Sequence, residues 1–79
     1  MKIEILGGGC QKCKKLEENV KAALEKMGRE AEILKVTSAS KIGNYGVMLT
    51  PALVVDGDVR IIGKVPEARE IISILEEYR

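Results

Sequence analysis

The sequence contains no histidine and only two cysteines, Cys10 and Cys13, among its 79 residues. A structural zinc site takes four ligands, most often cysteine and histidine, so one molecule of this chain cannot complete such a site. The 13 basic and 12 acidic side chains leave a formal net charge of +1, so no strong overall field favours nucleic acid as a partner. We therefore expect neither a fold stabilised by a structural zinc ion nor a protein that binds nucleic acid.

The sequence also lacks long hydrophobic runs. No apolar stretch approaches the roughly 18 residues that span a bilayer, and the first six residues are not apolar enough for a signal peptide. We therefore expect a cytoplasmic protein with no membrane partner. With 46% hydrophobic residues and no linker or repeat, residues 1–79 are expected to form a single monomeric domain.

Hydrophobic patterns predict seven elements in the order βαβαββα. The predicted strands are 2–6, 30–36, 52–55 and 58–62. The first two predicted helices cover residues 10 to 27, approximately, and 39–45. A third helix closes the chain, and Pro66 is expected in its first turn. Gly28 ends the first helix, and Asp56-Gly57 is typical of a tight hairpin turn. The expected fold class is α/β, a sandwich around a four-stranded mixed sheet with the first strand inside it and the hairpin at one side.

The motif Cys10-Gln11-Lys12-Cys13 follows the first strand and a run of three glycines, where the long helix begins. Unpaired backbone N–H groups and the helix dipole favour a thiolate at this position. The helical spacing of the apolar residues places Cys13 on the buried face of the helix with Leu16. Cys10 is then expected at the exposed N-terminal end of the helix. We therefore predict that Cys10 is a catalytic nucleophile and Cys13 the resolving thiol of a redox site. Lys12 and the two lysines after Cys13 add positive potential that lowers the pKa of Cys10.

Other interpretations of the two cysteines stay open at this point. They could be two small buried hydrophobes, and the glycine run could suggest a nucleotide loop, although Lys12 stands where GxGxxG has its third glycine. A Cu(I) metallochaperone is the main alternative, because small metal-carrying domains also place CxxC after the first strand. Those domains end with a strand, however, whereas a helix closes this chain. Iron–sulfur cluster binding across a dimer is a third alternative.

A second feature is Thr50-Pro51, immediately before the predicted hairpin. A proline that opens a strand usually follows a trans peptide bond. The preceding Val47, Met48 and Leu49 form an apolar stretch that either packs in the core or docks a partner's peptide.

The CxxC motif after the first strand, Thr50-Pro51 and the hairpin and helix that follow together resemble the thioredoxin superfamily. The nearest form is the group of small thioredoxin-like or glutaredoxin-like redox-active disulfide proteins, and the resemblance covers essentially the whole chain. It implies a thioredoxin-like three-layer sandwich and a dithiol–disulfide oxidoreductase in which Cys10 attacks and Cys13 resolves. It also implies that Pro51 is a cis-proline, that the backbone of Thr50 meets an extended substrate segment, and that Gly63 keeps the adjoining surface open.

The same resemblance implies the partners of the reaction. These are disulfide-containing proteins and, for recycling, a thioredoxin-reductase-like protein or a low-molecular-weight thiol, with no cofactor and no metal expected. Gln11-Lys12 departs from the Gly-Pro of thioredoxins and the Pro-Tyr of glutaredoxins, and Gly9 replaces the usual tryptophan. Glu4, the charged residue inside the first strand, is predicted to face solvent rather than to accept a proton from Cys13.

Overall fold

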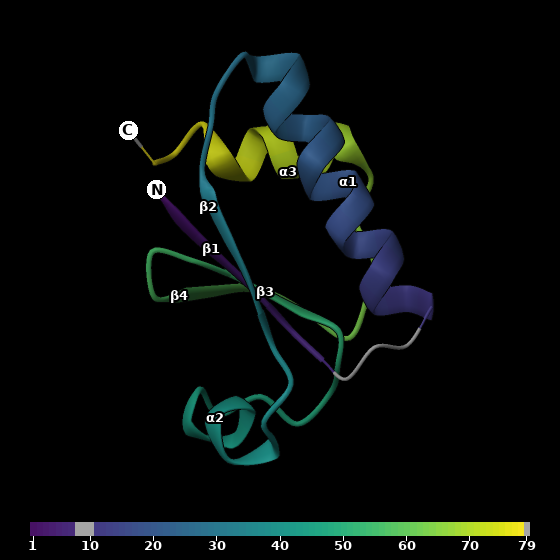
Figure 1. The fold of residues 1–79 in the computed structure, drawn as a ribbon, viewed down its shortest axis with the longest axis vertical. Helices are drawn as coiled ribbons and strands as arrows, with labels where there is room; N and C mark the ends of the chain where they lie inside the picture. Colours follow the sequence, from purple (N-terminus) through teal and green to yellow (C-terminus); the bar gives the residue numbers. More distant parts are fainter. Residues whose placement is uncertain (8–10, 79) are drawn as a thin grey trace.

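The computed structural model describes residues 1–7 and 11–78, and it confirms the predicted order of elements (Figure 1). The strands are β1 (Lys2–Leu6), β2 (Glu32–Val36), β3 (Ala52–Val55) and β4 (Asp58–Ile62), and the helices are α1 (Gln11–Met27), α2 (Ala39–Asn44) and α3 (Ala68–Leu75). The sheet order is β2-β1-β3-β4, with β1 parallel to β2 and antiparallel to β3. The α/β class and the mixed sheet with β1 inside it are therefore confirmed.

Local sequence signals account for most of the element boundaries. Helix α1 ends at Gly28, whose φ of 66° suits glycine and lets its N–H donate to the carbonyl of Glu25 at 3.1 Å. Ser38 caps α2, because its hydroxyl accepts a hydrogen bond from the N–H of Lys41. Asp56 and Gly57 both have positive φ, at 48° and 88°, as a tight hairpin turn between β3 and β4 requires.

Three boundaries differ from the predictions, the smallest difference being that α2 ends at Asn44 and not at residue 45. Pro66 precedes the N-cap residue Glu67, so it lies before α3 rather than in its first turn. The carbonyl of Pro66 accepts a hydrogen bond from the side-chain amide of Asn19 at 2.9 Å, which attaches the segment before α3 to helix α1. Strand β2 begins at Glu32, two residues later than predicted, where its N–H bonds to the carbonyl of Met1 at 3.1 Å.

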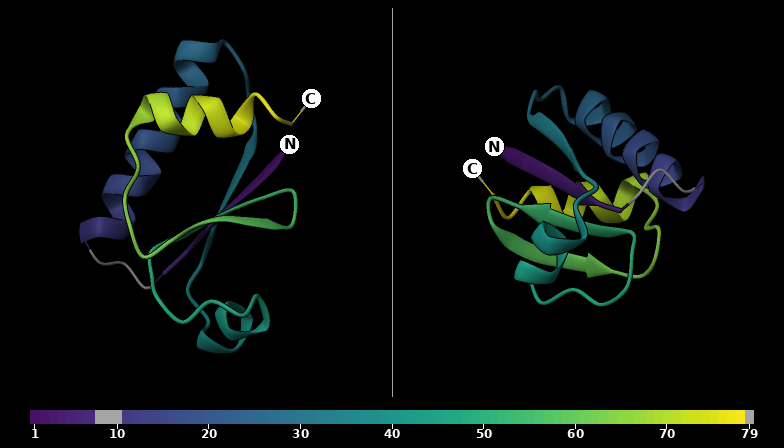
Figure 2. Two further views of the ribbon diagram at one scale, coloured as in Figure 1. Left: turned by 180° about the vertical axis from the view of Figure 1, so that it is seen from behind. Right: turned by 60° about the horizontal axis from the view of Figure 1, so that its bottom comes forward.

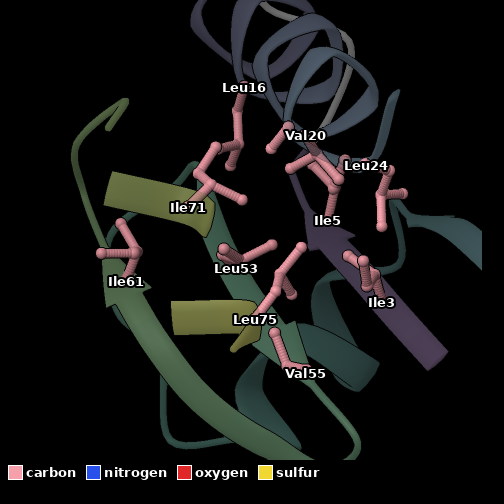
Figure 3. Close-up of a cluster of buried hydrophobic side chains, with 11 residues drawn as sticks. Ile3, Ile5, Leu16, Val20, Leu24, Leu53, Val55, Ile61, Ile71 and Leu75 are labelled. Atoms are coloured by element: carbon pink, nitrogen blue, oxygen red, sulfur yellow. The ribbon is translucent and has the colours of Figure 1, made fainter. Parts of the chain in front are cut away.

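The main core lies between one face of the sheet and helices α1 and α3, which cross on that face (Figures 1 and 3). Alternate residues of β1 and β3 point into it, as the period of two along a strand requires. Helix α1 contributes residues at helical spacing, and α3 contributes Ile71 and Leu75. The buried members are Ile3, Ile5, Leu16, Val20, Ala23, Leu24, Leu53, Val55, Ile61, Ile71 and Leu75.

A smaller core lies on the opposite face, where α2 stands apart from the other two helices (Figure 2). Its buried members are Leu6, Val47, Ala52 and Val54, and Ile42 of α2 packs against them. Glu4 shares this face of β1 and is only 8% exposed, because the hydroxyl of Tyr45 donates a 2.6 Å hydrogen bond to its carboxylate. The prediction that Glu4 faces solvent is therefore wrong.

Candidate functional site

The candidate site lies where β1 ends and α1 begins. Cys13 is in the first turn of the described helix and is 6% exposed, on the same buried stripe as Leu16. This confirms its predicted burial. Lys12, the residue before it, is exposed. Cys10 lies outside the described residues, so its exposure, its role and the effect of Lys12 on its pKa stay predictions.

Gly7 brings the helix and the proline loop together. It follows β1 directly and extends the strand pairing, because its N–H donates to the carbonyl of Val36 at 2.9 Å. A methyl group on Gly7 would collide with the sulfur of Cys13 and would lie 3.5 Å from the Cβ of Thr50. The missing side chain therefore lets Cys13 and Thr50 approach the same point of the backbone. The glycine run suggested backbone freedom near the cysteines, but not this close approach.

The predicted substrate-binding residues Pro51 and Gly63 are joined directly. The peptide bond between Thr50 and Pro51 is cis, as the family resemblance implies. Pro51 is buried whereas Thr50 is exposed, and the carbonyl of Pro51 accepts a 2.8 Å hydrogen bond from the N–H of Gly63. Gly63 has a φ of 73°, and a methyl group on it would lie 3.2 Å from the side chain of Leu49. The turn after β4 thus packs against the loop that precedes the cis-proline.

The apolar stretch before the cis-proline, residues 47–49, was predicted either to pack in the core or to dock a peptide, and it is partly buried and partly exposed. Val47 is 6% exposed and belongs to the smaller core with Leu6 and Ala52. Met48 and Leu49 are 94% and 64% exposed. The packing interpretation is therefore correct for Val47, and two large apolar side chains remain on the surface beside Thr50.

A small cavity of about 100 Å³ adjoins Cys13. It is lined by Ile5, Gly7, Cys13, Lys14, Glu17, Lys35 and Thr37. Glu17 lies one helical turn after Cys13, and its carboxylate contacts the ammonium groups of Lys35 at 3.0 Å and of Lys21 at 3.2 Å. The hydrogen bond from Lys35, with a smaller contribution from Lys21, holds the pKa of Glu17 below its usual value. An ionised carboxylate is therefore fixed on the wall of the cysteine cavity, which spacing alone did not reveal.

This ion-pair network predicts a pH-dependent stability. Because the pKa of Glu17 is lower in the folded state, its contribution is complete above the carboxyl pKa of the unfolded chain and disappears as the pH falls through the folded pKa. We expect Glu17→Gln to lower the free energy of unfolding at pH 7 by up to about 1 kcal/mol, and by much less at pH 2.5. Urea titrations at the two pH values measure this difference.

Glu18→Gln is the matched control for that prediction, since Glu18 is the next residue on α1 and is exposed. It should change the stability little at either pH. An equal loss of stability for Glu17→Gln at both pH values would show that the carboxylate charge is not responsible.

Within residues 1–7 and 11–78, no group of three or more histidine, cysteine, aspartate or glutamate side chains is placed to hold a metal ion. The helices in these same ranges are all too short or too polar to cross a membrane.

Comparison with known proteins gives three similar findings. The family described as "Thioredoxin domain" matches residues 1–76. A thioredoxin of Methanothermobacter thermautotrophicus is 40% identical over 75 residues, which cover 95% of this chain and 97% of that protein. A thioredoxin of Methanocaldococcus jannaschii is 42% identical over 76 residues, covering 96% of this chain and 87% of that protein.

Proposed function

Because the chain belongs to the thioredoxin superfamily, we propose that it is a small thiol–disulfide oxidoreductase acting through Cys10 and Cys13. The observation that carries the proposal is the position of Gly7, because both the buried Cys13 and Thr50, the residue before the cis-proline, approach it closely. A sulfur held inside the protein beside an exposed loop suits a resolving thiol, which must be kept from solvent yet be close to a bound partner.

The reaction consists of two thiol–disulfide exchanges. The Cys10 thiolate attacks one sulfur of a partner disulfide, so that a Cys10–partner bond forms and the partner's own S–S bond breaks. The departing partner sulfur leaves as a thiolate and takes up a proton. Cys13 then loses its proton and attacks the sulfur of Cys10, which releases the second partner sulfur as a thiol. Two electrons have passed from the protein dithiol to the partner, and the protein holds a Cys10–Cys13 disulfide.

The positions of the other predicted residues support the roles proposed for them. The N-terminal end of an α-helix carries a partial positive charge, which favours a thiolate at the start of the helix. The exposed Thr50 and the buried Pro51 would present the loop backbone to a substrate segment, and Gly63 fixes this loop through its bond to Pro51. The partners are disulfide-containing proteins, and a reductase or a low-molecular-weight thiol returns the protein to its dithiol form.

A single-turnover assay tests this function. The protein is reduced, separated from the reductant and mixed with a peptide disulfide, and the thiols of both molecules are counted by alkylation and mass spectrometry. We expect two peptide thiols to appear for every two protein thiols that disappear. Unchanged thiol counts in both molecules over hours would contradict the proposal.

A further inference from the structure

We propose that the exposed loop beside the cysteine site docks acidic, extended peptide segments of its disulfide-bearing partners; this substrate class rests on the function proposed above. The docking surface consists of residues from the loop, from the turn after β4 and from the start of α1. They are Met48, Leu49, Thr50, Lys64, Lys12, Lys14 and Lys15. The two parts of the docking surface are an apolar pair of side chains and a surrounding set of positive charges.

The apolar part of the docking surface is exposed, and Leu49 within it packs against the turn after β4. Met48 and Leu49 are 94% and 64% exposed, the two highest values among the large hydrophobic side chains of the described chain. Leu49 lies against Gly63, so the loop is supported from below by the turn after β4. Thr50, the next residue, adjoins Gly7 at the point where Gly7 meets Cys13. A peptide that covers Met48 and Leu49 would therefore have its neighbouring residues at the cysteine site.

The charge around these side chains has one sign. The segments that meet at the site are 11–15, 45–52 and 61–65, all of which the structure describes. Their charged residues are Lys12, Lys14, Lys15 and Lys64, and none of the residues in these three segments is acidic. Nearby carboxylates include Glu4, which accepts a hydrogen bond from Tyr45, Glu17, which contacts Lys21 and Lys35, and Glu67, which contacts Arg69 at 3.2 Å. Glu18 is exposed one helical turn after Lys14, so the four lysines still leave an excess of positive charge beside the site.

Half of the 12 acidic residues lie instead at the other end of the molecule. Figure 1 shows the β3–β4 turn and the C-terminal segment on the side away from the start of α1. Acidic residues of this end are Glu30, Glu32, Asp56, Asp58, Glu76 and Glu77, of which Glu77 is paired with Arg60 at 2.9 Å. The nearly zero net charge therefore hides an uneven distribution, with a positive field at the site that attracts an acidic segment and repels a basic one.

The occupant that fits both parts is an extended segment with acidic side chains and at least one apolar residue close to the disulfide. The apolar residue would cover Met48 and Leu49, and the acidic residues would lie near the lysines. Charge complementarity of this kind acts mainly on the rate of association and weakens as salt screens it.

Three peptide disulfides of equal length, with acidic, neutral or basic flanking residues, test the inference in the single-turnover assay. At low salt we expect the acidic peptide to be reduced about tenfold faster than the basic one, and the ratio to approach one as salt is raised. Equal rates for the acidic and basic peptides at low salt would overturn the inference while leaving the proposed function intact.

Matched charge variants locate the effect. Lys64→Glu should slow the acidic peptide about threefold and speed the basic one, since it reverses one charge beside the docking surface. Lys26→Glu is the control, because Lys26 is exposed in the last turn of α1, far along the helix from the site. Equal effects of the two variants would show that net charge, and not the docking surface, decides the rate. Met48→Gln should slow all three peptides by the same factor and so leave the ratio between them unchanged.

A binding measurement keeps the inference separate from the redox chemistry. If none of the peptide disulfides is reduced, the proposed function has failed, and an acidic peptide with serine in place of cysteine is titrated into the protein and followed by NMR. Amide shifts confined to the docking surface, the lysines of α1 included, would still support docking. Shifts at the opposite end of the molecule, or none at millimolar peptide, would overturn it.

Discussion

Replacing Cys10 by serine is expected to abolish disulfide reduction, whereas replacing Cys13 by serine leaves the first exchange intact and traps a mixed disulfide with the partner. The difference follows from the two roles, because attack on the partner needs a thiolate at the N-terminal end of the helix and release of the partner needs the second thiol. With Cys10→Ser the rate should fall at least about a thousandfold, to that of the uncatalysed exchange. Non-reducing electrophoresis and intact mass measure the trapped complex.

The double variant Cys10→Ser/Cys13→Ser is the control for this prediction, since it should form no adduct and should fold like the parent protein. Reversed behaviour would contradict the assigned roles. In that case Cys13→Ser would be inactive without an adduct, and Cys10→Ser would retain reduction or accumulate the mixed disulfide.

Gly7→Ala is expected to damage both stability and activity. The added methyl group meets the sulfur of Cys13, and the φ of 151° at this buried position is one that residues with a side chain rarely adopt. The helix start, the strand end or the Thr50 loop must therefore shift. We expect a loss of about 2 to 3 kcal/mol in the free energy of unfolding, together with a slower release of the partner, because Cys13 is displaced. Urea unfolding and the single-turnover assay measure the two effects.

Gly46→Ala is the control that separates the effect of the close contact with Cys13 from the effect of an unfavourable φ angle. Gly46 also has a positive φ, at 74°, but a methyl group on it would meet nothing within 4 Å. It should therefore lose the smaller amount of about 1 kcal/mol that is due to conformation alone, with activity preserved. If the two variants lost equal stability and both remained active, the contact between Gly7 and Cys13 would not be what shapes the site.

The parts of the fold that were predicted correctly depend on local signals. The hairpin follows from Asp56-Gly57, whose positive φ angles few other residue pairs adopt at low energy. Helix α1 follows from its hydrophobic period and from Gly28 at its end. The burial of Cys13 follows from the same period, because Leu16 lies three positions further on and on the same face of the helix.

The features that the sequence did not reveal depend on residues far apart in the chain. Glu4 is buried because Tyr45, 41 residues away, donates a hydrogen bond to its carboxylate. The network on the cavity wall joins Glu17 of α1 to Lys35 of β2, and only the parallel packing of that strand brings the two together. The role of Gly7 was missed for the same reason, since it requires Cys13 and Thr50 to converge from different elements.

The central claim is that Cys10 and Cys13 form a reversible dithiol–disulfide couple, and an equilibrium redox titration tests it most directly. The protein is equilibrated with thiol/disulfide buffers of stepped potential, and its thiols are alkylated and counted by mass. We predict one two-electron transition, from two alkylated thiols to none, at a potential between about −270 and about −120 mV. If both thiols stay reduced across the whole range and the protein binds stoichiometric Cu(I), the result contradicts the account and favours the metallochaperone.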